Sequence, residues 1–544
     1  MVRLPVFVSM VICLTISAPT FAVAIIVAKS GGDYNSVQSG LNAASAGDTV
    51  YVKAGTYTET VTFSKSGTSG APIVLCNYGT DTSVIDGNGT NNNIITISGK
   101  SYVQVIGIEV RNASGGDPSI GISIDGSGSN ILIKNCKVHN IKSDNTNAHG
   151  IAVYGTEAAP IHNIVLDKNE VYDCLLGQSE SIVLNGNVDT FQIINNVVHD
   201  NDNIGIDLIG FESTAVAIDA VDQARNGIVA ENHVYNISSK SNPTYSGVQS
   251  ADGIYVDGGE NIIIERNIVD SCDIGIEIAS EHEGKTTSNI IIRDNFVSRS
   301  YQGNIMTGGY DSNKGSALNI IIVNNTTYHG NNGEILLQYN NDSITVKNNI
   351  LYANSNVKYV TTNGSNNTHV TVANNLYYGA SANLPGKWTD ASAIFADPQF
   401  VTTGSDFHVS ATSPAIDAGA NIGTLSGTMD IDGQERTYGS CVDIGADEYG
   451  SSFVVAKSRF TYSKSVVSLV RQKSAWVLSF TLVSAMNVSY EIVDVAGKIL
   501  FRSSAIAYSA GPCRIRINVK KFAKQAFLIR MTLGSDVKAF NVVD

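Results

Sequence analysis

The chain has 544 residues, of which 43% are hydrophobic and 15% charged, and it contains 50 glycines but only 10 prolines. This composition excludes a collagen-like or disordered chain. The formal net charge of −14 argues against general nucleic-acid binding, because a polyanion would be repelled. Beyond the N-terminal segment, no apolar run reaches the roughly 18 residues of a membrane-spanning helix, so we expect none in the mature protein.

The N-terminus has the pattern of an export signal. Arg3 precedes an apolar run over residues 6–16, and the small residues around Ala22 and Ala24 provide a cleavage pattern. We therefore interpret residues 1–24 as a signal peptide and expect the protein to be secreted or held at the cell surface. An uncleaved membrane anchor is the alternative, although the apolar core is short for spanning a bilayer.

A short phrase of β-branched residues ending in Asn recurs through the middle of the chain. Its final Asn residues are spaced 24 to 36 residues apart, and they are Asn169, Asn196, Asn232, Asn267, Asn295, Asn325, Asn349 and Asn375. A second strand phrase, such as Gly253-Ile-Tyr-Val-Asp-Gly, lies between the copies. Two strands in each repeat, without a helical period, predict a parallel β-solenoid whose coils must stack to bury their apolar faces. The Asn residues should form a hydrogen-bonded column along one edge.

Residues 25–450 resemble a right-handed parallel β-helix of the pectin-lyase-like superfamily. The resemblance lies in the opening segment, Tyr34-Asn-Ser-Val-Gln-Ser-Gly-Leu-Asn-Ala-Ala followed by Ala46-Gly-Asp-Thr-Val-Tyr-Val, and in the closing segment Ser413-Pro-Ala-Ile-Asp-Ala-Gly with Val442-Asp-Ile-Gly-Ala-Asp-Glu-Tyr. It implies a capping helix and first coils over residues 25–100, a β-helix with an active-site face over 101–380 and a closing module over 381–450. The superfamily hosts lyases, glycosidases, esterases and adhesins, so the resemblance leaves the reaction open.

The last part of the chain differs in charge from the rest. Residues 453–544 carry 14 Lys and Arg against 4 Asp and Glu, whereas the remainder carries 21 against 45. Their alternating polar and apolar residues predict a small β-sandwich. The segment resembles the sorting domains of the Bacteroidota-type secretion system, which implies the secretion machinery as a partner. A carbohydrate- or cell-wall-binding module is the alternative.

Carboxylates gather on one predicted face of the solenoid. Because side chains alternate along a strand, the first outward position of the second phrase reads Ala152, Val183, Asp207, Tyr255, Glu277, Met306 and Leu336 in successive coils. Asp257 occupies the next outward position of its coil. We predict that Asp257 and Glu277 form the acid–base or nucleophile pair, that Asp207 tunes their protonation, and that Glu281 is a reserve catalytic residue.

Polar residues at the strand ends and in two long insertions, about 212–226 and 238–251, extend this face. Long loops on a rigid solenoid commonly build a binding site. The predicted substrate-binding residues are Tyr255, Glu180, Asp252, Glu212, Arg225, Tyr245, His282 and Tyr310.

Three functions fit this pattern. A glycoside hydrolase acting on a plant or algal polysaccharide or oligosaccharide needs a carboxylate pair and no certain cofactor. A calcium-dependent polysaccharide lyase would bind Ca²⁺ through Asp207, Asp257 and Glu277, but no Lys occupies the outward positions, and Lys285 and Arg225 are the nearest candidate bases. A non-catalytic adhesin is the third, although acids confined to one region argue against it. We favour the hydrolase.

Overall fold

The computed structural model describes residues 22–143, 146–215, 219–380 and 388–451, together with most of the strands and some short connections between residues 468 and 542. The chain divides into two compact units, residues 1–451 and 452–544. The predicted signal peptide falls almost entirely on residues 1–21, which lie outside the described part. Within the described part, no helix combines the length and the apolar character needed to cross a membrane.

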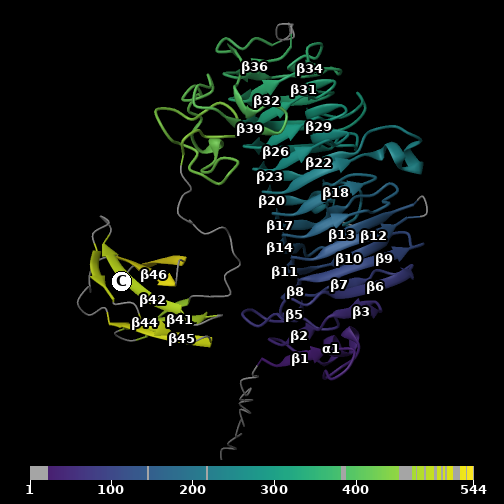
Figure 1. Ribbon diagram of the computed structural model, residues 1–544, viewed down its shortest axis with the longest axis vertical. Helices are drawn as coiled ribbons and strands as arrows, with labels where there is room; N and C mark the ends of the chain where they lie inside the picture. Colours follow the sequence, from purple (N-terminus) through teal and green to yellow (C-terminus); the bar gives the residue numbers. More distant parts are fainter. Residues whose placement is uncertain are drawn as a thin grey trace, which may run out of the picture. The chain divides into compact units, whose positions relative to one another are not determined.

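The first unit is a parallel β-helix built from three long sheets, and Figure 1 shows its coils stacked in chain order. Sheet I has 13 strands: β1 (Ala24–Val27), β2 (Thr49–Val52), β5 (Ile73–Asn77), β8 (Val103–Ile106), β11 (Gly128–Lys134), β14 (Ile161–Asp167), β17 (Val188–Ile194), β20 (Arg225–Ala230), β23 (Glu260–Glu265), β26 (Thr286–Arg293), β29 (Ser316–Val323), β32 (Asn341–Lys347) and β35 (Thr371–Ala373).

Sheet II, which bears the predicted site, has 11 strands: β4 (Val61–Thr62), β7 (Ile95–Ser98), β10 (Ser119–Gly126), β13 (Ala148–Gly155), β16 (Ile182–Gly186), β19 (Ile206–Ile209), β22 (Asp252–Asp257), β25 (Ile274–Ala279), β28 (Gly303–Thr307), β31 (Gly333–Leu337) and β34 (Val360–Thr362).

Sheet III has 13 strands: β3 (Gly55–Thr58), β6 (Ser83–Thr90), β9 (Ile108–Ser114), β12 (Lys137–Lys142), β15 (Glu170–Tyr172), β18 (Val197–Asn201), β21 (His233–Ile237), β24 (Ile268–Asp270), β27 (Phe296–Ser298), β30 (Thr326–Tyr328), β33 (Ile350–Tyr352), β36 (Leu376–Tyr378) and β37 (Ile394–Phe395). Each coil thus contributes three strands, where the sequence predicted two. Sheet III was missed because its strands, directly after the Asn corner, are often only three residues long.

The predicted Asn column is confirmed. Asn232, for example, donates its side-chain Nδ2 to Asn267 Oδ1 at 2.9 Å and to the carbonyl of Ile193 at 2.8 Å. The same side-chain link joins each member from Asn169 to Asn375 to the next. The column lies at the corner between sheets I and III, where it satisfies backbone groups that the turn leaves without a strand partner.

The interior is a single column of aliphatic side chains from all three sheets, running from Ile25 to Tyr377. The predicted capping helix is present as α1 (Val37–Ala43), and Ser36 caps it by accepting a hydrogen bond from the amide of Ser39 at 3.2 Å. Its Val37 and Leu41 are buried in the aliphatic core.

Residues 388–451 fold back along the flank of the coils. They contain β38 (Phe400–Thr402), β39 (Asp406–Val409) and the 3₁₀ turn η4 (Gly423–Ser426). Phe407 and Val409 pack with Phe296 and Leu376 of sheet III. Arg436 is fully buried, 3.3 Å from Asp294 Oδ1, and donates to the carbonyls of Asp443 and Gly445. This segment therefore covers the side of the last coils.

The second unit contains two antiparallel sheets. One consists of β40 (Ser468–Gln472), β41 (Ala475–Leu482) and β45 (Gly511–Asn518). The other consists of β42 (Met486–Asp494), β43 (Ile499–Arg502), β44 (Ile506–Tyr508), β46 (Phe527–Leu533) and β47 (Asp536–Val542). The all-β fold class predicted from the sequence, a parallel β-helix followed by a small antiparallel β unit, is confirmed.

Candidate active site

The outward column of sheet II has the register that the sequence predicted. Tyr255 of β22 pairs with Asp207 of β19 on one side and with Glu277 of β25 on the other. Beyond Glu277 the column continues with Met306 and Leu336. Asp257, two residues after Tyr255, pairs with Ala279. The parallel register therefore gathers acids from three consecutive strands on one face.

The carboxyls of Asp252 and Glu277 interact directly through a side-chain hydrogen bond. Burial raises the pKa of Asp252 well above its usual range, and the neighbouring charge of Glu277 raises it further. Burial also raises the pKa of Glu277, to about 7, although hydrogen bonds from Asp252 and from the amide of Gln338 favour its ionised form. Two carboxyls in contact cannot both ionise easily, so the pair resists losing its last proton.

Asp207 and Asp257 lie beside this pair. Both are almost completely buried, and burial raises the pKa of each well above its ordinary value. After burial, the charge of Glu180 contributes most to the raised pKa of Asp207, and the charge of Glu281 contributes most to the raised pKa of Asp257. Asp207 Oδ1 has no hydrogen-bond partner, whereas Asp257 Oδ1 accepts the backbone amide of Glu281 at 2.8 Å.

The two insertions reach this face, as predicted. The first contains the 3₁₀ turn η1 (Asp219–Val221), and it brings Glu212, whose Oε2 accepts a hydrogen bond from Asn185 at 2.7 Å. The second contains η2 (Ser239–Ser241) and η3 (Pro243–Tyr245), and the hydroxyl of Tyr245 accepts a hydrogen bond from Asn203 at 3.1 Å. Burial raises the pKa of Tyr245, with smaller contributions from the charges of the carboxyl cluster.

The other predicted residues occupy different positions. Tyr255 donates its hydroxyl to Glu281 Oε1 at 3.4 Å. Tyr310 is 51% exposed, and the ammonium of Lys314 lies 4.5 Å from its ring centre. Arg225 donates to the carbonyls of Val221 and Gln223 and to Asn187, which is an anchoring role at the base of the first insertion.

Four further polar side chains surround the cluster: His149, Tyr154, Asn185 and Gln338. His149 Nδ1 lies 3.3 Å from Glu180 Oε2, and its Nε2 shares a 2.9 Å hydrogen bond with the hydroxyl of Tyr154. Tyr154 and Asn185 occupy the same outward column as Asp257, so the alternation of side chains along the strands could have placed them in the predicted site. His149 precedes its strand phrase as Glu180 and Asp252 precede theirs, so the same position in the repeat could have pointed to it.

The donor atoms of Glu212, Asp257 and His282 lie within 4.8 Å of one another, which is close enough to surround a metal ion. The set predicted for calcium, Asp207, Asp257 and Glu277, does not form such a group within the described residues. The reason is the register: Tyr255 separates Asp207 from Glu277, and Glu277 is already engaged by Asp252.

The fold and this face define a parallel β-helix with a buried acidic cluster, and sequence comparison places the chain more narrowly. A family model described as "Pel9A-like, right handed beta helix region" matches residues 29–191. The uncharacterized protein YwoF of Bacillus subtilis (strain 168) is 39% identical over 406 residues, covering 68% of this chain and 86% of that protein. The chain therefore belongs to the same family as YwoF.

Several solved structures align with much of the chain at low sequence identity. The pectate lyase Pel9A aligns with a TM-score of 0.44 at 16% identity, over 78% of this chain and 96% of its own. XylC in complex with xylose aligns with a TM-score of 0.41 at 12% identity, over 91% of this chain and 100% of its own. The A-module of the mannuronan C-5 epimerase AlgE6 from Azotobacter vinelandii aligns with a TM-score of 0.38 at 15% identity, over 67% of this chain and 95% of its own. The family-model match ends before Asp207, so it does not include the carboxyls between Asp207 and Glu281.

Proposed function

We propose that this protein is a secreted glycoside hydrolase that cleaves a neutral or weakly charged polysaccharide, with Glu277 as the general acid and Asp207 as the general base. The observation that carries the proposal is the Asp252–Glu277 pair. Burial raises the pKa of Glu277 to about 7, so this carboxyl still carries a proton in part of the molecules near neutral pH and can protonate the oxygen of a leaving sugar.

The backbone spacing of Asp207 and Glu277 is closer to what an inverting hydrolase needs than to what a retaining one needs. Asp207 and Glu277 stand in one outward column, with Tyr255 between them. Two strand spacings correspond to roughly 9.6 Å between their backbones. Inverting enzymes hold their carboxyls about 6.5–9.5 Å apart, which leaves room for a water molecule, whereas retaining enzymes hold them about 5–5.5 Å apart.

The charge of the face favours a neutral substrate. The outward column from Ala152 to Leu336 contains two acids and no Lys or Arg. The carboxylate of a uronic acid would be repelled here unless a cation bridged it. Hydroxyl groups of a neutral sugar could instead donate hydrogen bonds to the ionised members of the cluster.

The test is a screen of the purified protein on neutral and acidic polysaccharides, followed by the variants Glu277→Gln and Asp207→Asn. Each variant should reduce the release of reducing sugar at least about 100-fold, the lower range for loss of a general acid or base. The exposed Glu157→Gln serves as a matched control and should retain activity. Normal rates in both site variants would exclude the proposed roles.

A polysaccharide lyase is the second candidate. It is supported by the family-model match and by Lys285, whose ammonium lies 4.9 Å from the ring centre of Phe211 beside the cluster. A lyase acting on a polyuronate would form an unsaturated product that absorbs in the near ultraviolet. Loss of that absorbance in Lys285→Ala, with activity retained in Glu277→Gln, would favour the lyase. Glycan binding without turnover would indicate an adhesin.

A further inference from the structure

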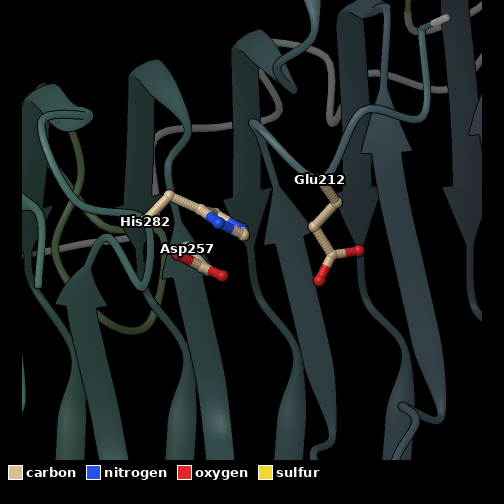
Figure 2. A group of neighbouring side chains, drawn as sticks. All are labelled: Glu212, Asp257 and His282. Carbon is tan, nitrogen blue, oxygen red and sulfur yellow. The ribbon is translucent and has the colours of Figure 1, made fainter.

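The side chains of Glu212, Asp257 and His282 converge from three consecutive coils of the β-helix (Figure 2). Glu212 follows β19, Asp257 ends β22 and His282 follows β25. We propose that these three side chains form a binding site for a divalent transition-metal ion of the Mn²⁺ or Zn²⁺ type. This inference goes beyond the proposed hydrolysis and does not depend on it.

The donor atoms of the three side chains are spaced closely enough to surround one ion. One ligand atom from each side chain lies within 4.8 Å of the others. Ligands at about 2.0–2.2 Å from a single ion are themselves roughly 3 Å apart, so small side-chain rotations complete the site. Asp257 is held toward this point because its Oδ1 accepts the amide of Glu281, the residue next to His282.

Two buried polar atoms in this region have no hydrogen-bond partner. The Nε2 atom of His282 is buried and makes no hydrogen bond. Asp207, on the strand that leads to Glu212, is only 2% exposed and leaves its Oδ1 unpartnered as well. Buried polar atoms without partners are costly and rare in folded proteins. A bound cation would satisfy the imidazole directly and compensate the negative charge around Asp207.

The ligand types indicate which metal ion fits this site. Calcium and magnesium prefer oxygen ligands alone, whereas an imidazole nitrogen with two carboxylates suits manganese, zinc and their neighbours in the first transition series. The ligand set here has one nitrogen donor and two carboxylates. Because Glu212 lies on the first insertion, binding the metal would also fix that loop against the strand face.

The experiment is titration of Mn²⁺, Zn²⁺ and Ca²⁺ by isothermal calorimetry into the full chain, expressed without a polyhistidine tag and freed of metal with a chelator. We expect one equivalent of Mn²⁺ or Zn²⁺ to bind to the wild type, and His282→Ala and Asp257→Asn to weaken binding at least tenfold. Glu277→Gln should bind the metal normally and lose hydrolysis, which separates a failure of this inference from a failure of the proposed function.

The matched control is His408→Ala. His408 belongs to the other described group of this kind, with Asp432 and Asp447 in the segment that covers the flank, but both of its ring nitrogens already face carboxylates, Asp406 at 2.5 Å and Asp432 at 3.0 Å. His408→Ala should leave the stoichiometry and affinity unchanged. Unchanged binding in His282→Ala, loss of binding in His408→Ala alone, or binding of calcium only would each overturn the proposal. Circular dichroism of every variant verifies that the β-helix remains folded.

Discussion

Replacing Glu277 by Gln should flatten the pH dependence of stability. Folding raises the pKa of Glu277 from its ordinary value of 4.5 to about 7, chiefly because the side chain is buried. Between these values the folded protein binds more protons than the unfolded chain, so its stability falls as the pH rises through this window. A difference of about 2.5 units corresponds to about 3 kcal/mol, present below pH 4.5 and lost above pH 7.

The groups that face Glu277 explain why one substitution is informative. Asp252 shares a hydrogen bond with it, the side-chain amide of Gln338 donates another, and Glu281 adds a like charge. A Gln side chain removes the titration and one source of repulsion, so the remaining carboxyl of Asp252 should ionise more easily. Both effects reduce the loss of stability at high pH.

The assay is chemical denaturation at several pH values between about 4 and about 8, monitored by circular dichroism. The wild type should lose about 3 kcal/mol more than Glu277→Gln as the pH increases over this range. The exposed Glu157→Gln, again the control, should follow the wild type. Parallel stability curves for wild type and Glu277→Gln would refute the reasoning, because they would show that Glu277 titrates alike in the folded and unfolded states.

Four other outcomes are expected. Hydrolysis should decline as the pH rises above about 7, since Glu277 must hold a proton to act as the acid, and a pH–rate profile measures this. Asn267→Ala should lower the free energy of unfolding by about 3–5 kcal/mol, because it removes a buried side chain that is hydrogen-bonded to both of its neighbours in the Asn column. In the same denaturation assay, replacement of the exposed Asn92 by Ala should change this free energy by less than about 0.5 kcal/mol. Arg436→Met should destabilise by about 3–5 kcal/mol, because it removes the nearer of the two arginines beside the buried Asp294 and leaves Arg293 at 4.0 Å, and adding Asp294→Asn should restore part of the loss in thermal unfolding. Deleting residues 453–544 should leave a folded, active β-helix that is no longer displayed or released correctly, and a much lower melting temperature would contradict this.

The sequence determined the coil repeat and the outward columns. A recurring β-branched phrase with a terminal Asn specifies its own stacking, because identical phrases can bury their apolar faces only against one another. The alternation of side chains along each strand then predicted Asp207, Tyr255 and Glu277 in one column, which is the register that the structure has. The predicted Asn column followed from the same periodicity.

The tertiary structure decided which of these residues are partners. Asp252 was expected to bind substrate, yet its carboxyl is hydrogen-bonded to that of Glu277 on the neighbouring strand. Contacts of His149 with Glu180 and of Gln338 with Glu277 link residues 31 and 61 positions apart, which no local pattern can encode. The convergence of Glu212 and His282 on Asp257 likewise depends on how two loops fold over the strands, and loop paths are fixed by the packing of the whole unit and not by a repeat.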